Sequence, residues 1–517
     1  MRALNAASVS ASSGESAEAN YRAAPPASIS RTFAQFARSN AARIVLVSAL
    51  VLIPCVWHRR IVASDLGSHL YNAWLVQLIR AHSVPGLYLA QQHTNVLFDY
   101  LLDALGRVLT LYHAETVAVS LCVLAFFWGM FALAAAAARR APWCLAPALA
   151  MFTYGYTFHM GFFNYYLSLA FAFWGIAIAW RARSASDLAL ILPFAALAAV
   201  AHPLGLAWLV AGGVYVFVAT RLPTRWHIAL VALAIAALAG VHHYVWHHNI
   251  VEEQMLPFFY FTGADQLVLF SERYKWIEYA FLAFSALAIG RDLWANRSKN
   301  PARRNYAIPA ELYVILLVAV ALLPEGIRFA DQVPALALLT GRLTSVSAAL
   351  LCCLLAAMRP RRWHFAGFLA LAAVYFTFVN RDTGVINRME LQVEQLVHTL
   401  PPDQRVMGSV PPLDGSRILI QHMLDRSCIG HCFSYGNYEA AAKLFRVRGT
   451  PGNPYVITDF DSTADMEEGV YQVQDEDLPA YGVYVCDPDD GTKLCIRALK
   501  SGELVDPHAS LPPSDNP

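Results

Sequence analysis

Eleven apolar runs constrain the fold of this 517-residue sequence more than any other feature. Each approaches the roughly 20 apolar residues that an α-helix needs to cross a bilayer, and shorter runs suffice where helices are buried in a bundle. The charged fraction is 15%, against roughly 25% in soluble globular proteins. We therefore predict an α-helical polytopic membrane protein with about eleven transmembrane helices, at 43–58, 114–138, 142–159, 162–181, 186–201, 203–220, 226–246, 274–291, 308–323, 334–358 and 363–380.

Arginines fall in alternate short loops between these runs. They are Arg139-Arg140, Arg181 with Arg183, Arg221 with Arg225, the stretch from Arg291 to Arg304, and Arg359 to Arg362. The positive-inside rule places these loops and the N-terminus in the cytoplasm. Arginine outnumbers lysine 33 to 5, a bias that hints at a GC-rich bacterial genome. We therefore predict a multi-pass protein of the bacterial inner membrane with a periplasmic C-terminal part.

The composition divides the chain into four parts. Residues 1–40 are rich in Ala, Ser and Pro and are predicted to form a disordered cytoplasmic tail. The membrane domain covers 41–382, and the outer loop 59–113 within it carries apolar residues at helical spacing on both sides of Pro85-Gly86. Two amphipathic helices fit this loop, lying either on the membrane surface or on the bundle.

A periplasmic domain is predicted at 383–505, followed by a disordered tail at 506–517. Helical spacing continues through 386–397, directly after the last apolar run. Short β-rich runs follow at 405–410, 455–458, 482–486 and 494–499. The pattern indicates a small α/β domain.

Asp65 and His69 form the first candidate site, just after the first apolar run. If a helix begins near Ser64, which is placed to cap it, the two side chains lie one turn apart. They could then act as general base and orienting group, or bind a divalent metal. Alternatively, Asp65 simply belongs to the helix start, where the macrodipole favours it.

Arg342 is the second candidate because it lies inside a late apolar run, about two turns from its outer end. An arginine in a membrane segment costs roughly 2.5 kcal/mol or more unless it is paired or reaches water. It could meet Asp65, Glu325 or the phosphate of a lipid-linked substrate, or extend to the outer interface. Arg328 precedes it in the outer turn 324–333.

Polar residues also occupy two tight outer turns. Asn164 and Tyr165 follow Gly161, and His202 precedes Pro203. These side chains could line an outer cavity and bind a polyol, although an interfacial aromatic belt explains the tyrosine equally well. His243 and His247 have the spacing of helical metal pairs, but no third ligand is identifiable, so no metal site is predicted there.

The cysteines divide by location. Five lie in apolar runs, where a thiol behaves as a small hydrophobe. The remaining four, in the C-terminal part, are disulfide candidates: Cys428, Cys432, Cys486 and Cys495. Local pairing of 428 with 432 and of 486 with 495 is the simplest interpretation, and crossed pairings stay open.

Several function classes find no support in the sequence. The net charge of about +1 favours neither nucleic acid nor acidic partners. P-loop, Rossmann and GxSxG patterns are missing from suitable contexts, which argues against an ATP-driven pump or an enzyme that uses cytoplasmic nucleotide-sugars. No cofactor is predicted, apart from the open question of a divalent metal at Asp65.

The run Asp65–Ala73, placed after the first span and before amphipathic loop helices, resembles the first outer loop of the GT-C superfamily of polytopic glycosyltransferases. Arg342 resembles the basic residue that meets the lipid phosphate in this superfamily. Most members carry two adjacent acids in the loop, whereas Leu66 follows Asp65 here. The resemblance covers the layout of about 44–380 and does not extend to a two-acid metal site.

The resemblance implies a transferase that moves a sugar from a polyprenyl-phosphate donor to an acceptor on the outer face of the inner membrane. Asp65 would be catalytic, with His69 beside it, and Arg342 would bind the lipid phosphate. Their positions in outer turns make Arg328, Asn164, Tyr165 and His202 further candidates for substrate binding. Lipid-linked sugar and membrane lipid are the expected partners. The alternative is a non-catalytic membrane protein, either a glycolipid transporter or a degenerate GT-C scaffold for envelope assembly.

Overall fold

The computed structural model describes residues 29–252, 261–296, 300–328, 336–442 and 444–510, and these are mostly helical. Six helices are long and apolar enough to cross a membrane. They are α1 (Ile29–Val51), α4 (Leu111–Ala138), α7 (Phe163–Arg181), α11 (His227–His248), α14 (Leu339–Ala357) and α15 (Arg362–Val397). The chain is therefore compatible with a multi-pass membrane protein, and the count of about eleven spans stays a prediction.

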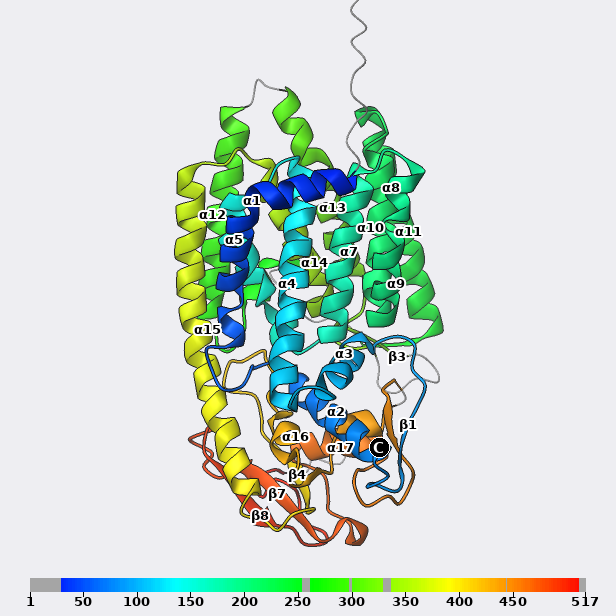
Figure 1. Cartoon of the computed structure of the whole chain (residues 1–517), viewed down its shortest axis with the longest axis vertical. Helices are drawn as coiled ribbons and strands as arrows, with labels where there is room; N and C mark the ends of the chain where they lie inside the picture. Colours follow the sequence, from blue (N-terminus) through cyan, green and yellow to red (C-terminus); the bar gives the residue numbers. More distant parts are fainter. Residues whose placement is uncertain (1–28, 253–260, 297–299, 329–335, 443, 511–517) are drawn as a thin grey trace, which may run out of the picture.

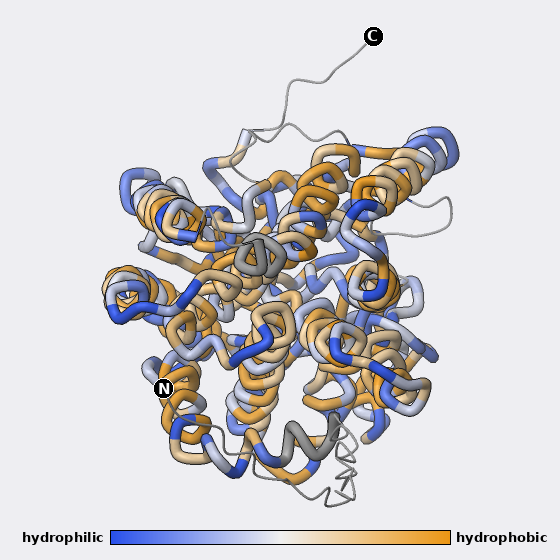
Figure 2. Tube along the Cα trace, turned by 90° about the horizontal axis from the view of Figure 1, so that it is seen from above, coloured by the Kyte–Doolittle hydropathy of each residue, from blue (hydrophilic) through white to orange (hydrophobic). Residues whose placement is uncertain are grey.

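The other predicted spans correspond to shorter, interrupted or less apolar helices. The run 142–159 divides into α5 (Ala146–Thr153) and α6 (Tyr156–His159), and 186–201 divides into α8 (Ala185–Ala189) and α9 (Leu192–Ala201). The remaining three are α10 (Pro203–Ala219), α12 (Tyr274–Ala295) and α13 (Asn300–Leu322). Seen along the bundle in Figure 2, hydrophobic residues dominate the helices and hydrophilic residues gather at the turns.

The first helix begins inside the region predicted as a disordered tail. Residues 1–28 lie outside the described part, but α1 already starts at Ile29. Phe36 stacks on Trp143 with ring centroids 6.0 Å apart, and it also contacts Phe131. This aromatic packing holds a segment whose polar composition had indicated disorder. The start of α1 lies across the end of the bundle where α8 is found (Figure 1).

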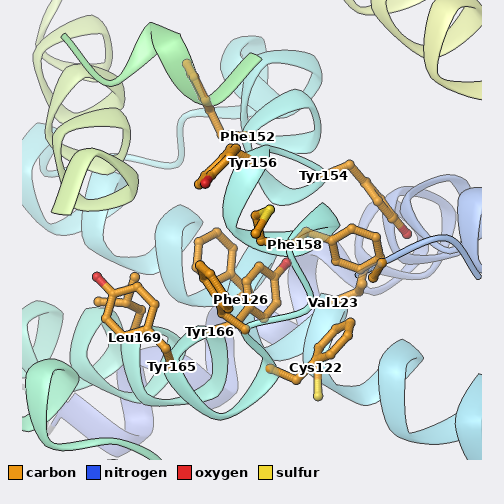
Figure 3. Close-up of a cluster of buried hydrophobic side chains, with 14 of the residues drawn as sticks. Cys122, Val123, Phe126, Phe152, Tyr154, Tyr156, Phe158, Tyr165, Tyr166 and Leu169 are labelled. Carbon is orange, nitrogen blue, oxygen red and sulfur yellow. The ribbon is translucent and has the colours of Figure 1, made fainter. Parts of the chain in front are cut away.

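The core of the bundle is aromatic, and α4 packs along α7 through it. Phe126 of α4 and Tyr166 of α7 stack with centroids 4.0 Å apart. Figure 3 shows these two rings at the centre, with Phe158 and Tyr154 beside them. The Tyr166 hydroxyl donates to the backbone carbonyl of Thr153 over 2.8 Å, so the buried phenol is satisfied.

At the opposite end of the bundle from α8, the outer loop meets the C-terminal unit (Figure 1). The loop forms the two predicted helices, α2 (Leu66–Arg80) and α3 (Leu97–Gly106). Strand β1 (Leu87–Leu89) between them pairs with β6 (Val447–Gly449) of the C-terminal unit. Helix α2 packs against α16 (Met423–Cys428) and is largely buried, so it lies between the bundle and the C-terminal unit rather than on a lipid surface.

The C-terminal unit contains a four-stranded sheet in the order β5-β4-β7-β8. Its strands are β5 (Phe433–Ser434), β4 (Arg405–Gly408), β7 (Ala480–Val485) and β8 (Leu494–Ala498). Strand β4 runs parallel to β5 and β7, and β7 runs antiparallel to β8. The predicted strand at 455–458 is wrong, because the Asn453 side chain bonds both the N–H and the C=O of Val456.

Two further features connect the bundle to this unit. Helix α15 continues without interruption for 36 residues and passes from the bundle into the C-terminal unit (Figure 1). The second feature is a buried charge group centred on Arg426 of α16, whose guanidinium pairs with Glu115 of α4 and Glu390 of α15. A short antiparallel pair of β2 (Ile250–Glu252) and β3 (Gly326–Arg328) joins two other loops.

Candidate functional site

The start of α2 is held by backbone contacts with the turn before α7. The Ser64 N–H donates to His159 O over 2.8 Å, and the Asp65 N–H donates to Met160 O over 3.2 Å. Gly161 has φ +78°, and a Cβ there would lie 2.5 Å from Asp65 N, so only glycine fits this turn. The close contact fixes where the Asp65 backbone lies.

Asp65, and not Ser64, occupies the N-cap position of α2, and its side chain makes no capping bond. The expectation that Ser64 caps the helix is therefore wrong, because the helix begins one residue later. The side chain of Asp65 is 21% exposed. Its carboxylate is thus accessible to a ligand and is not occupied by a capping hydrogen bond.

His422, from the C-terminal unit, approaches Asp65 directly. Its Nε2 lies 3.7 Å from Asp65 Oδ1, while its Nδ1 lies 3.1 Å from Asp425 Oδ2. Glu467 of α17 (Phe460–Glu468) lies 3.9 Å from the same Nδ1. Ser434 Oγ donates to the other oxygen of Asp425. The imidazole is thereby oriented with one nitrogen toward Asp65.

His69, one turn after Asp65, faces a second pair of acids. Its Nδ1 lies 2.8 Å from Asp99 Oδ1 of α3 and 3.6 Å from Glu439 Oε1. The Ser68 hydroxyl donates to Glu439 over 3.2 Å. We call these seven residues the acidic–histidine cluster: Asp65, His69, Asp99, His422, Asp425, Glu439 and Glu467.

Charge pairing sets the protonation of the two histidines. Burial disfavours the charged form of each imidazole, yet the surrounding carboxylates raise the pKa of His69 to about 9 and that of His422 to about 10. Asp99 and Glu467 supply the largest favourable contributions to these two shifts. Both histidines are therefore cationic at neutral pH.

Burial raises the pKa values of three acids of the cluster. Burial raises the pKa of the Asp65 carboxyl above its usual value, and the charges of His422, His69 and Arg342 oppose this shift. Burial also raises the pKa of Glu439 to about 8 and that of Glu467 to about 7. Carboxylates with raised pKa values beside fixed cations are typical of groups that exchange protons near neutral pH.

Arg342 lies in the first turn of α14 rather than two turns deep, because that helix begins at Leu339. Its guanidinium sits over the Phe162 ring, 3.8 Å from the centroid, and its Nε donates to Ala337 O over 3.2 Å. It interacts electrostatically with Asp65 and with the Tyr438 hydroxyl. Among the described residues, no carboxylate oxygen lies within 4.0 Å of this guanidinium.

Asn164 and Tyr165 contact residues of the site, and His202 contacts Tyr165. Asn164 Nδ2 donates to Asp99 Oδ2 over 2.9 Å, so it holds the acid that pairs with His69. The Tyr165 hydroxyl donates to the Arg342 carbonyl over 2.6 Å. His202 is the N-cap of α10, where its Nδ1 accepts from the Leu204 N–H, and its ring contacts Tyr165 edge-on.

Arg328 lies apart from this group. It is exposed at the end of β3, paired with β2. His243 and His247 stack with centroids 4.0 Å apart on α11, and His247 Nδ1 contacts the His243 carbonyl. Within the described ranges, no group of three His, Cys, Asp or Glu side chains is arranged to hold a metal ion.

Two disulfides lie in the C-terminal unit, Cys428–Cys432 and Cys486–Cys495. The first closes the turn directly after α16, the helix that follows His422. The five cysteines in apolar runs are free thiols. The CxxxC segment therefore forms a disulfide cross-link in the turn after α16, close to His422 in the sequence.

Sequence reasoning missed most of the cluster. It identified Asp65 and His69 but not His422, Asp99 or Glu439. A signal was present at His422 and Asp425, because this i,i+3 spacing puts an imidazole and a carboxylate on one side of a helical turn. What the sequence could not supply was the contact between this turn and the outer loop.

The space next to His69 is small. A cavity of about 10 Å³ is lined by residues that include His69, Asp99 and Glu439. This is about the volume that one water molecule needs, and the polar lining offers it hydrogen-bond partners. The cavity thus has room for one water molecule between His69, Asp99 and Glu439.

No family model matches the chain, and comparisons with curated proteins and with solved structures also returned no match.

Proposed function

We propose that the protein is a GT-C-like glycosyltransferase, which moves a sugar from a polyprenyl-phosphate donor to an acceptor hydroxyl at the outer face of the bacterial inner membrane. One observation carries this proposal: the Arg342 guanidinium stacks on Phe162, and the adjacent Gly161 packs against the backbone of Asp65, so a carboxylate and a guanidinium from distant parts of the chain share one polar centre. A base and an anion-binding cation are the two groups that the reaction requires.

The chemistry would run as a single displacement. Asp65 takes the proton of the acceptor hydroxyl as its oxygen forms a bond to the anomeric carbon. The bond between that carbon and the phosphate oxygen breaks, and its electron pair leaves with the polyprenyl phosphate. Arg342 stabilises the charge that develops on this phosphate. A phosphate is already a good leaving group, so no general acid is needed.

The surroundings of the two groups support these roles. Asp65 is partly exposed and carries a raised pKa, as suits a general base. The Arg342 guanidinium is held by its stacking on Phe162, with its terminal nitrogens not paired to a described carboxylate. A planar guanidinium binds phosphate oxygens in a bidentate way that lysine does not match. The charges of His422 and His69 favour the ionised form of Asp65 against the effect of burial on its pKa.

The membrane orientation is part of the proposal. The arginine-rich turns and the cluster belong to opposite ends of the bundle, with α8 at one end and α2 and α16 at the other (Figure 1). The positive-inside rule assigns the first end to the cytoplasm. The cluster and the C-terminal unit would then face the periplasm, where lipid-linked sugars are used and disulfides persist.

The test is sugar transfer in membranes that contain the full chain and a radiolabelled polyprenyl-phosphate sugar. Asp65→Asn keeps the size of the side chain but removes the base, so transfer is expected to fall at least a hundredfold, within the range that general base catalysis contributes. Asp489→Asn, in the exposed β7–β8 turn, is the matched control and should transfer normally. Unchanged transfer in Asp65→Asn removes Asp65 from the mechanism.

A non-catalytic role as a glycolipid transporter or assembly scaffold is the second candidate. Leu66, in place of a second loop acid, is the observation that favours it. In that case the labelled glycolipid binds and Arg342→Gln weakens its binding, yet no labelled product forms with any acceptor fraction. The same membranes therefore distinguish the two functions.

A further inference from the structure

A large cavity opens at the end of the bundle opposite the acidic–histidine cluster. Its volume is about 1700 Å³, and its walls come from α1, α4, α7 and the end of α10. This exceeds the roughly 300–1,000 Å³ of ordinary small-molecule pockets. A ligand that fills it must therefore be long, and the wall chemistry identifies its two ends.

The deep part of the cavity is apolar. It extends along α4 from Leu124 to Arg139, a length of about 22 Å at 1.5 Å per residue. Small side chains on α4, including Ala132 and Ala136, line this part and pack closely against α7. Trp174 of α7 donates its indole N–H to the Ala125 carbonyl over 3.3 Å and braces this wall. An acyl chain matches this lining.

The rim of the cavity is strongly basic. Five guanidinium groups line it, against the single carboxylate of Asp187: Arg139, Arg140, Arg181, Arg183 and Arg221. Arg139 adopts φ 56°, a left-handed C-cap conformation that usually belongs to glycine. Glycine would adopt this backbone conformation with less strain. The strain at Arg139 therefore suggests that its side chain has a function.

Contacts hold part of the rim in place. Arg221 donates to the Ala182 carbonyl over 2.6 Å and so ties the end of α10 to the end of α7. Arg140 donates to the Ala356 carbonyl over 2.9 Å. Arg139, Arg183 and Arg221 are exposed at the surface. Backbone carbonyls thus hold Arg140 and Arg221, while Arg139 and Arg183 lie exposed beside the apolar slot.

We propose that this cavity is a binding site for an anionic membrane phospholipid, with the phosphodiester at the arginine rim and an acyl chain along α4. Guanidinium groups favour phosphate through bidentate hydrogen bonds. The start of α1 crosses this end of the bundle (Figure 1), and Phe36 lines the cavity, so the lipid would be covered on one side by that helix. The site is independent of the proposed transfer reaction.

The experiment measures lipid binding to the detergent-solubilised full chain by native mass spectrometry. Phosphatidylglycerol is expected to bind at least about tenfold more tightly than phosphatidylcholine, since arginines near the membrane surface attract anionic headgroups. The triple variant Arg139→Gln, Arg183→Gln and Arg221→Gln should lose this preference. Its matched control replaces Arg225, Arg291 and Arg362, which are exposed and do not line the cavity, and should keep it.

A second variant tests the apolar slot without altering charge. Ala132→Leu narrows the wall beside α7 and should weaken phosphatidylglycerol binding several-fold, while the thermal unfolding temperature reports whether the bundle is intact. Equal binding by the rim triple and its control would overturn the proposal, because the effect would then be general surface charge. Inorganic phosphate, or a polyprenyl phosphate, binding more tightly than phosphatidylglycerol would overturn the choice of ligand.

Discussion

His422 Nε2 lies 3.7 Å from Asp65 Oδ1, so an imidazole of the C-terminal unit meets a carboxylate at the start of α2. Asp425 and Glu467 surround the other side of the same ring. The two histidines of the cluster are thus cations placed among five acids. This arrangement determines how the site and the junction around it respond to pH and to substitution.

His422→Gln should shift the pH dependence of transfer. The His422 charge opposes the rise in the pKa of Asp65 caused by burial, so its loss lets that pKa rise further. A general base must be deprotonated, and the acidic limb of the pH–rate profile then moves to higher pH. We expect a larger loss of activity at pH 6 than at pH 8. His508→Gln, at an exposed position, is the control and should leave the pH profile unchanged. An identical profile in both variants would show that the charge of His422 does not affect the pKa of Asp65.

The junction should lose stability as the pH rises above neutral. The folded-state pKa values of His69 and His422, about 9 and about 10, exceed the ordinary value of 6.5. Their contribution is fully present below pH 6.5 and is lost as the pH rises through 9 to 10. Burial raises the pKa of Glu439 to about 8 and that of Glu467 to about 7. Ionisation of these two buried carboxyls as the pH rises therefore also destabilises the fold.

This pH effect is measured as resistance of the C-terminal unit to trypsin, or as the unfolding temperature, between pH 6.5 and 10. Both are expected to fall across the range. The double variant His69→Asn, His422→Gln should show a smaller fall. A wild-type protein equally resistant at both ends of the range would contradict the assigned protonation states.

Arg426→Met should destabilise the protein strongly. It leaves the buried carboxylates of Glu115 and Glu390 without their cation, and breaking one partner of such a group costs about 3–5 kcal/mol. Arg388→Met, at an exposed position on α15, is the control and should change the unfolding temperature little. Adding Glu115→Gln and Glu390→Gln to Arg426→Met should recover part of the loss, whereas no recovery would argue against a charge effect.

Gly67→Ala should disturb the contact between α2 and α16. A Cβ at Gly67 would lie 2.1 Å from the His422 carbonyl oxygen, so the two helices must separate. Alanine in an unobstructed helix is stabilising, but overpacking of this kind costs about 1–3 kcal/mol and should dominate. Gly491→Ala, where the added Cβ meets open space, is the control. An unchanged unfolding temperature in Gly67→Ala would contradict this prediction, because α2 and α16 would then accommodate the methyl group without loss of stability.

Local pattern in the sequence predicted the elements well wherever one helix face or one strand carried the signal. Helical spacing predicted α2, α3 and the extension of α15, and short β-rich runs predicted the strands β4, β7 and β8. The limits were tertiary. The sequence around His422 does not indicate that this residue contacts Asp65. At 455–458, composition favoured a strand, but the Asn453 side chain accepts a hydrogen bond from the Val456 N–H and the segment bends instead. Arg342 lies closer to the start of its helix than predicted, because α14 begins at Leu339 and apolar composition alone does not locate that start.

The division of the cluster between the two ends of the chain has a consequence for biogenesis. Asp65 and Glu115 are made and delivered to the membrane long before His422 and Arg426 leave the ribosome. At about 5–20 residues per second, synthesis of the intervening chain takes on the order of tens of seconds. Throughout that interval Asp65 lacks the charge of His422 and Glu115 lacks that of Arg426, so we expect water to solvate them in the nascent bundle. The last hundred residues therefore act as the closing step of assembly, and a protein truncated before them would display a wet, acidic surface where the finished site should be.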